Sequence, residues 1–140
     1  MTSSASNLTV GTALQPFRLE FVDPEWMKTW AVALHDPNPI HLDVEVVKAK
    51  GLGDRVINQG PANLAYIINM LKKAIPGSTI ESLDVRYVDN VLGGDAVEAA
   101  GSVTDIAIDA SGTRITCDVW LKADARDLVI KGVAVVSIAV

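Results

Sequence analysis

The chain has 140 residues, the size of one typical domain, and 49% of them are hydrophobic although only 5% are aromatic. This much apolar surface excludes an intrinsically disordered chain. The net charge of −5, with no cluster of Lys and Arg, argues against nucleic-acid binding and against a polybasic membrane anchor. The mean hydropathy of +0.29 is high for so small a domain, so we expect another subunit to cover part of the apolar surface.

The cysteine and histidine counts indicate neither a disulfide framework nor a metal site. The one cysteine, Cys117, cannot form an internal disulfide, and only two histidines accompany it. Cys117 lies in an alternating segment and is interpreted as a small buried strand residue rather than a nucleophile. The polar N-terminus does not resemble a signal peptide, and the apolar residues 132–140 are too few to cross a membrane as a helix. We therefore expect a cytoplasmic protein without membrane contact.

The first half of the chain is predicted to contain a strand and then helices. Residues 14–22 are rich in apolar side chains and predict a strand. Asp23 can cap the next helix, which Pro24 opens and in which Trp26 and Trp30 repeat at helical spacing. Pro37 ends this helix by residue 35 or 36, because the residue before a proline avoids helical geometry.

Two more helices follow. Asp43 is predicted to cap a short helix that extends to Lys50 and ends at Gly51. A stronger helix opens at Gly60-Pro61 and ends at Pro76-Gly77. Its predicted buried stripe consists of Leu64, Ile67, Ile68 and Leu71.

The remainder of the chain is predicted to form strands at residues 79–88, 96–108, 114–123 and 127–140. Residues 109–112 are expected to form a hairpin loop of about four residues. Because tight turns link the last three strands, an antiparallel meander is expected. The fold class is therefore α+β: a long apolar helix lies on the concave face of a curved antiparallel sheet.

The densest group of polar residues is the loop Asp36-Pro37-Asn38-Pro39-Ile40-His41. Two prolines restrict its backbone, so Asp36 and His41 are presented with little conformational entropy left to lose. The two side chains can meet across one water, which the carboxylate holds while the imidazole takes or gives a proton. This pairing suits the addition of water to an activated double bond, or its removal. The same residues also make a plain turn, an alternative that the spacing alone leaves open.

Gly60 is the second candidate for a functional position. A helix N-terminus presents unpaired amides and partial positive charge, and a glycine there lets a substrate carbonyl approach the backbone. Such amides can stabilise an enolate as it forms. An ordinary loop-to-helix joint is the alternative, since Gly and Pro are common at such joints.

The string from His35 to Asp43 resembles the signature of the MaoC-like, R-specific enoyl-CoA hydratase family, also called hydratase 2. That signature is Asp-x-Asn-Pro-x-His followed by an apolar and an acidic residue, and every position matches. Gly60 also falls where the family has a glycine at the start of its main helix. The resemblance implies a single hotdog domain over residues 10–140, preceded by a flexible N-terminus at residues 1–9.

The resemblance also implies an activity and its residues. The family hydrates enoyl thioesters or dehydrates 3-hydroxyacyl thioesters, and Asp36 and His41 match its catalytic pair. Gly60 matches the glycine whose amide binds the thioester carbonyl, Asn38 matches the asparagine that holds the loop, and Gln59 stands beside the glycine. We take Gly60, Asn38 and Gln59 as substrate-binding candidates. No cofactor is implied, because coenzyme A or acyl carrier protein is the carrier of the substrate's acyl group. The resemblance also leads us to expect a homodimer or a dimer of dimers.

The chain departs from the family pattern at three places. Leu34-His35 stands where many members have Ser-Gly or Thr-Gly, so His35 is a second imidazole beside the site. Gln59 replaces a frequent histidine, and residues 67–69 lack a serine that some members carry. These changes leave the water-activating pair intact but put the usual acyl-chain length in doubt.

Two other functions compete with the hydratase. A hotdog thioesterase has a similar fold but lacks the Asp-x-Asn-Pro-x-His string. A non-catalytic acyl-binding subunit of a hydratase heteromer is expected to have lost the Asp or the His. Both residues are present here, which favours the enzyme.

Overall fold

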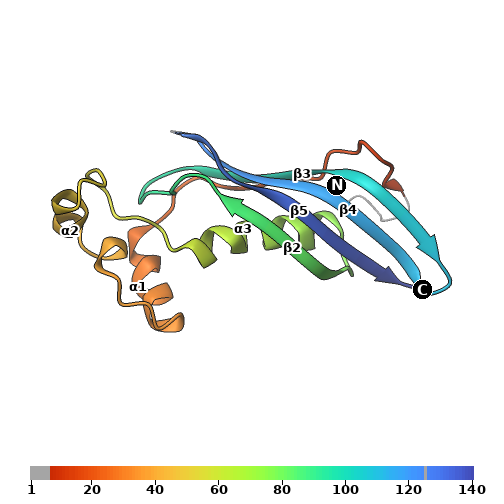
Figure 1. Ribbon diagram of the computed structural model, residues 1–140, viewed down its shortest axis with the longest axis horizontal. Helices are drawn as coiled ribbons and strands as arrows, with labels where there is room; N and C mark the ends of the chain where they lie inside the picture. Colours follow the sequence, from red (N-terminus) through yellow and green to blue (C-terminus); the bar gives the residue numbers. More distant parts are fainter. Residues whose placement is uncertain (1–6, 125) are drawn as a thin grey trace.

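The computed structural model of the chain, which describes residues 7–124 and 126–140, combines one long helix with an antiparallel sheet (Figure 1). Of the predicted flexible N-terminus, residues 1–6 lie outside the described residues, whereas Leu8 is buried in the core. The elements in chain order are β1 (Phe17–Leu19), α1 (Pro24–Ala33), the 3-10 helix η2 (Pro39–His41), α2 (Val44–Ala49), α3 (Gly60–Ala74), β2 (Thr79–Tyr87), β3 (Val97–Asp109), β4 (Gly112–Ala123) and β5 (Asp127–Ala139).

The five strands form one sheet in the order β1-β3-β4-β5-β2, and every neighbouring pair is antiparallel. The predicted meander of the last three strands is thus confirmed. The loop between β3 and β4 is shorter than predicted, since Asp109 pairs with Gly112 and only two residues lie between them. The Asp109 carboxylate accepts hydrogen bonds from the amide and hydroxyl of Ser111, and Gly112 supplies the positive φ of 141° that closes the turn.

The first strand is also shorter than predicted: β1 covers three residues of the nine at 14–22. The chain does run beside β3 earlier, because Ala13 forms a bridge with Ser102 and the Leu14 amide donates to the Gly101 carbonyl. Pro16 lies between these contacts and β1. Proline has no N–H to donate to a sheet ladder, which explains the interruption.

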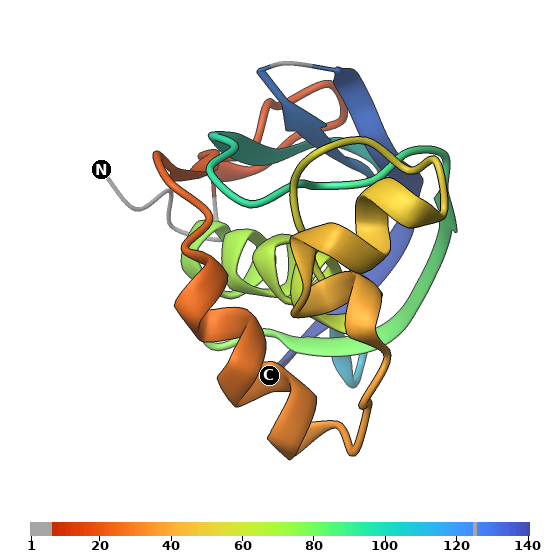
Figure 2. The same ribbon diagram turned by 90° about the vertical axis from the view of Figure 1, so that its left-hand side faces the viewer.

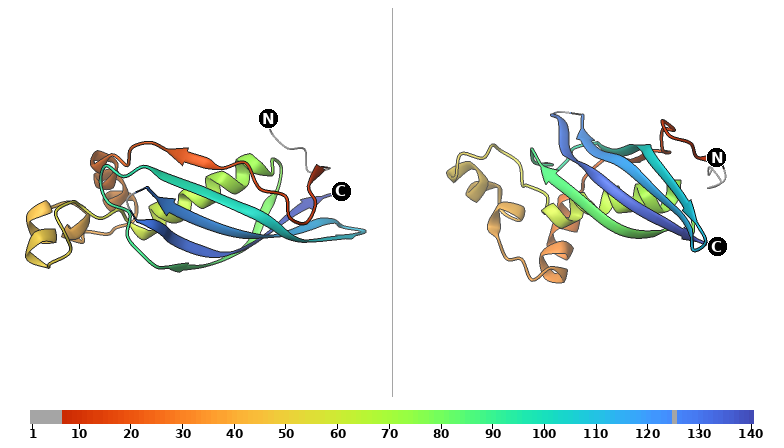
Figure 3. Two further views of the ribbon diagram at one scale, coloured as in Figure 1. Left: turned by 90° about the horizontal axis from the view of Figure 1, so that it is seen from above. Right: turned by 45° about the vertical axis from the view of Figure 1, so that its right-hand side comes forward.

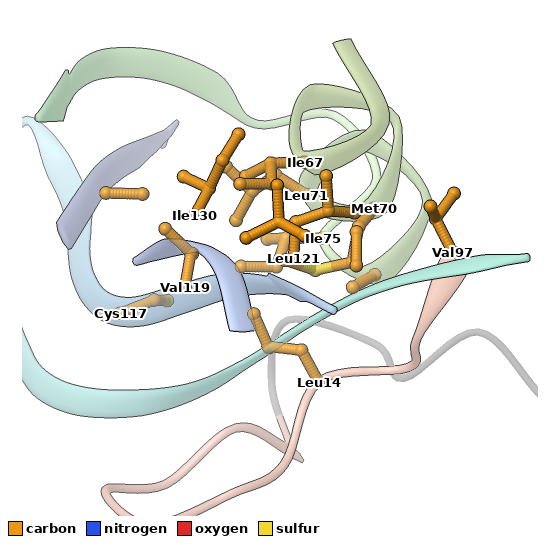
Figure 4. Close-up of a cluster of buried hydrophobic side chains, with 14 of the residues drawn as sticks. Leu14, Ile67, Met70, Leu71, Ile75, Val97, Cys117, Val119, Leu121 and Ile130 are labelled. Atoms are coloured by element: carbon orange, nitrogen blue, oxygen red, sulfur yellow. The ribbon is translucent and has the colours of Figure 1, made fainter. Parts of the chain in front are cut away.

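Helix α3 lies along the concave face of the sheet, and the strands curve around it (Figure 3). Gly101 in β3 lies where the neighbouring strand leaves no room for a side chain. A Cβ at that position would lie 2.6 Å from the carbonyl oxygen of Asp118 and 3.4 Å from the Met70 side chain. The core joins apolar side chains of α3 and its C-terminal end to those of the strands and the N-terminal segment; they include Ile67, Met70, Leu71, Ile75, Leu14, Val97, Cys117, Val119, Leu121 and Ile130 (Figure 4).

The buried stripe of α3 differs in part from the prediction. Ile67 and Leu71 are fully buried as expected, but Leu64 and Ile68 are only half-buried. Met70 and Asn63 are buried in addition. The buried face of α3 therefore includes Met70, whose side chain lies near Gly101 of β3.

Helices α1 and α2 and the 3-10 helix η2 gather at the end of the sheet where α3 begins (Figures 1 and 2). The opposite end carries the β3–β4 hairpin and the C-terminus (Figure 1). The predicted caps are confirmed, since Asp23 accepts from the Glu25 amide before α1 and Asp43 accepts from the Glu45 amide before α2. Within the described residues, no helix combines the length and apolarity that a membrane span requires.

Candidate active site

The position of Asp36 is set by the C-terminal end of α1. The chain leaves α1 through His35, whose φ of 52° is left-handed. The Asp36 amide then donates to the carbonyl of Ala31, five residues earlier, at 2.9 Å. This is the arrangement of a Schellman motif, in which the left-handed position favours glycine. The family's frequent glycine before the aspartate therefore has a conformational reason, and His35 adopts the same geometry at a cost.

The loop after α1 is stabilised by its own side chains. The backbone N–H of Asn38 donates to Asp36 Oδ1 at 3.2 Å. The side-chain oxygen of Asn38, Oδ1, accepts from the backbone N–H of Ile40 at 3.3 Å. Asn38 is thereby the cap of η2, which Pro39 begins and His41 ends. Asn38 thus supports the loop, because its side-chain oxygen accepts a hydrogen bond from the loop backbone.

The imidazole of His41 is buried and held at both nitrogens. Nδ1 lies 2.6 Å from the carbonyl oxygen of Ile57, and the Ile57 amide donates to the Ile40 carbonyl at 3.0 Å. Nε2 lies 3.3 Å from Asp36 Oδ2. The sequence places these two side chains across one water, whereas the structure brings them within direct contact distance because η2 shortens the loop between them.

The tautomer of His41 follows from its partners. A carbonyl oxygen can only accept, so Nδ1 must donate its proton to Ile57. The neutral ring therefore carries its lone pair on Nε2, beside the Asp36 carboxylate, and the protonated ring can donate there. Asp36 is about one-third exposed while His41 is almost fully buried, so solvent reaches the contact between Nε2 and Oδ2 from the Asp36 side.

Gly60 begins α3, as predicted, and the segment that carries it also holds His41. Only two residues, Asn58 and Gln59, lie between Ile57 and Gly60. As the first residue of a helix, Gly60 has no intrahelical acceptor for its N–H, and among the described residues this amide makes no other hydrogen bond. Its carbonyl accepts a hydrogen bond of 3.0 Å from the hydroxyl of Tyr87 at the end of β2. Burial raises the pKa of Tyr87 above its ordinary value, so the hydroxyl keeps its proton.

Gln59 is fully buried, and its contact in the structure is with α1. Its Nε2 donates to the Met27 carbonyl at 2.8 Å, which ties the middle of α1 to the start of α3. Its Oε1 has no hydrogen-bond partner among the described residues. The structure thus places Gln59 next to Gly60 in the chain but directs its amide toward Met27.

The sequence reasoning missed a polar cluster next to these residues. Asn58 Nδ2 donates to Asn63 Oδ1 at 2.8 Å and to the hydroxyl of Tyr66 at 3.1 Å. Burial raises the pKa of Tyr66, and the bond from Asn58 only partly offsets that. The sequence could have indicated this cluster, because Asn63 and Tyr66 are polar side chains in an otherwise apolar helix, five and eight residues after Asn58.

The fold and the loop geometry define an α+β protein with a carboxylate–imidazole pair at the N-terminal end of its central helix. The family model for the MaoC like domain matches residues 7–121. The chain therefore belongs to the MaoC-like domain family. No curated protein sequence matches it.

Solved structures with the same fold include hydratases. The (R)-hydratase from A. caviae involved in PHA biosynthesis has a TM-score of 0.83 and 24% identity, with 96% of this chain and 99% of that chain covered. The R-hydratase PhaJ1 from Pseudomonas aeruginosa has a TM-score of 0.81 and 19% identity, with 96% and 84% covered. The ChsH1-ChsH2 complex from Mycobacterium tuberculosis has a TM-score of 0.77 and 22% identity, with 93% and 98% covered. These similarities establish the hotdog fold.

Proposed function

We propose that this chain hydrates enoyl thioesters to 3-hydroxyacyl thioesters, or catalyses the reverse dehydration. The observation that carries the proposal is the contact of 3.3 Å between His41 Nε2 and Asp36 Oδ2 in a chain of the MaoC-like family. Membership of that family, together with R-hydratases among the structures of the same fold, supports the reaction class. The acyl group, its carrier, and the roles of Asp36, His41 and Gly60 are part of the proposal.

In the hydration direction, the pair binds a water molecule that donates one O–H to Nε2 and one to the Asp36 carboxylate. The water oxygen attacks the β-carbon of the conjugated thioester while Nε2 takes its proton. The electron pair of the double bond moves toward the carbonyl, which becomes an enolate oxygen. The α-carbon then takes a proton from the pair, which returns to its starting state, and the net reaction adds one water.

The amide of Gly60 is the proposed donor to the enolate oxygen. Its N–H already lacks an acceptor within the described chain, and it lies at the positive end of the α3 dipole. A donor that is in place before the reaction costs no reorganisation when the charge develops. Pro61 has no N–H, so a second donor has to be another group.

Other parts of the proposal concern the setting of the reaction. The carrier is coenzyme A or acyl carrier protein, and the chain itself needs no cofactor. We expect it to act in the cytoplasm as a homodimer or a dimer of dimers; the heteromeric ChsH1-ChsH2 complex shows that a chain of this fold can also pair with a different subunit.

The test is turnover of crotonyl-CoA, followed by loss of absorbance of the conjugated thioester and by release of free thiol. A hydratase removes the absorbance without releasing thiol. Release of thiol would instead identify a thioesterase. If a panel of enoyl thioesters from short to bulky acyl groups gave neither signal, the chain would be the non-catalytic subunit and the proposal would be wrong.

A further inference from the structure

The aromatic residues of this chain are few, and most of them gather in one place. The sequence has only seven Phe, Trp and Tyr residues. Four of them line a single hollow of about 350 Å³ between α1, α3 and the segment before α1. The residues that line it are Leu19, Phe21, Val22, Asp23, Trp26, Trp30, Asn58 and Tyr66.

The two tryptophans of the hollow lie on one face of α1. Trp26 and Trp30 are four residues apart, so their side chains stand one above the other on the helix surface. Trp26 is 65% exposed and Phe21 is 57% exposed. Large apolar surfaces in contact with water are costly, which indicates that something covers this face in the functional state.

The wall opposite α1 is fixed in advance. The ring of Tyr66 stacks against Phe17 with centroids 6.3 Å apart and planes 16° apart. The Tyr66 hydroxyl accepts from Asn58 Nδ2. The buried contact between Gln59 and the Met27 carbonyl fixes α1 relative to α3, so the two walls are anchored to neighbouring residues, Asn58 and Gln59.

The hollow and the proposed reaction site share one segment of the chain, residues 57–60. Asn58 lines it, Ile57 holds His41, and Gly60 begins α3. This short segment thus carries the anchor of the imidazole, a lining residue of the hollow and the proposed enolate donor. A thioester with its carbonyl at Gly60 can direct its acyl chain into the hollow.

We infer that this hollow binds the acyl end of the substrate and selects thioesters whose acyl group carries a planar ring. The inference rests on the proposed function and names its substrate class. Four aromatic side chains around about 350 Å³ suit a flat ring, which stacks on Trp26 and Trp30 on one side and on Tyr66 on the other. A second copy of the chain is the competing occupant of this exposed face.

The experiment compares the binding of two saturated thioesters, which cannot be hydrated, by titration calorimetry. The ligands are 4-phenylbutanoyl-CoA and butanoyl-CoA, and the protein is the full chain. We expect the phenyl ligand to bind about 10- to 100-fold more tightly, as burial of a phenyl ring in an apolar site predicts. In the double variant Trp26→Leu/Trp30→Leu that ratio should fall about 10-fold, because leucine retains apolar contact but not ring stacking.

The third tryptophan supplies the matched control. Trp120 lies on the other face of the sheet, outward from β4, and Trp120→Leu should leave both affinities unchanged. Circular dichroism checks the fold of each variant, and the single change Trp26→Leu, at a mostly exposed position, provides a second variant that should lower the ratio in part.

Two results would overturn the inference: equal affinities for the two ligands in the unchanged chain, or a ring preference that survives the double variant. In the first case, a fall in molecular mass of the double variant by light scattering would identify a second copy as the occupant. Failure of the proposed function looks different. A chain that hydrates no enoyl thioester can still show the ring preference, and a chain that hydrates crotonyl-CoA without the preference keeps its proposed function and loses only this inference.

Discussion

At the residue scale, the two nitrogens of His41 face two acceptors, the Ile57 carbonyl and the Asp36 carboxylate. In the proposed mechanism, Nδ1 fixes the ring and Nε2 exchanges the proton with water. Under that mechanism, loss of the Asp36 carboxylate removes the group that holds the water, and loss of the His41 imidazole removes the base.

We therefore predict that Asp36→Asn and His41→Gln each lower kcat for crotonyl-CoA by about 10²- to 10⁴-fold. Asn at position 36 can still accept from the Asn38 amide, so the loop and the fold should persist. Far-UV circular dichroism and the melting temperature serve as controls. Near-normal turnover in either folded variant would remove that residue from the mechanism.

Gly60 allows a graded test of the enolate site. A Cβ at this position would lie 3.6 to 3.8 Å from the ring of Tyr87, which is ordinary contact, so Gly60→Ala should fold and lose little activity. Valine adds two methyl groups that must displace either the Tyr87 ring or the substrate. We expect Gly60→Val to lower kcat/KM by about 10²-fold or more, comparable to loss of one oxyanion donor. Equal, near-normal kcat/KM values in both folded variants would place the carbonyl elsewhere.

Cys117 tests the interpretation of a buried structural thiol. Its side chain is fully buried on the inner face of β4, and burial, helped by the charge of Asp118, raises the pKa of the thiol to about 11. Because the pKa is raised, the thiolate appears only as the pH approaches that value; at pH 8 it is about one part in a thousand. We predict that iodoacetamide labels native protein at pH 8 far more slowly than unfolded protein in urea. Labelling at the same rate in both states would show that the core does not bury the thiol.

At the element scale, the end of α1 combines a structural cost with a functional position. His35 adopts a φ of 52°, where a side chain is disfavoured and glycine is not. The residue that carries this strain directly precedes Asp36.

We predict that His35→Gly stabilises the fold by about 0.5–1 kcal/mol, since relief of the left-handed strain outweighs the extra freedom of glycine in the unfolded chain. Urea unfolding should give a higher midpoint with an unchanged slope. His35→Ala is the matched control: alanine also disfavours a positive φ, so it should give no such gain. A midpoint that rises equally in both variants would trace the effect to the imidazole rather than to the backbone.

The sequence predicted most elements because each depends on local chemistry. Asp23 and Asp43 cap helices through amides two residues away, and strand alternation in β4 places Ile115, Cys117 and Val119 on one face. Two predictions that were wrong, the length of the first strand and the length of the β3–β4 loop, also have local causes. Pro16 interrupts the first strand, and the Asp109 side chain tightens the β3–β4 loop.

The site was predictable only in part. The motif pointed to Asp36 and His41, but their separation depends on the Ile57 carbonyl, sixteen residues after His41. Sequence spacing contains no information on such a contact. The aromatic hollow depends on two parts of the chain, residues 19–30 and 58–66, and only the folded structure brings them together.

At the scale of the whole molecule, the start of α3, the end of α1 and the 3-10 helix η2 lie together at one end of the sheet (Figures 1 and 2). Beyond them, α3 continues along the concave face of the sheet and shares one hydrophobic core with it. Among the residues that the structure describes, the sheet is open, because β2 pairs with β5 on one side and with no strand on the other. An unpaired strand edge presents backbone N–H and C=O groups that another chain can pair with.

The last prediction is that the protein is at least a dimer in solution. The open edge of β2, the mean hydropathy of +0.29, and exposed apolar side chains such as Val32, at 77% exposure, and Val88, at 46%, all favour association. Copies with a net charge of −5 repel one another, so the association has to be largely apolar and should persist in 1 M NaCl, which screens charge but does not weaken apolar contact. Light scattering at micromolar concentration should report at least twice the chain mass of 14.9 kDa in both low and high salt. A mass near that of one chain would contradict the prediction, and a dimer that dissociates in high salt would show that ion pairs rather than apolar surfaces hold it together.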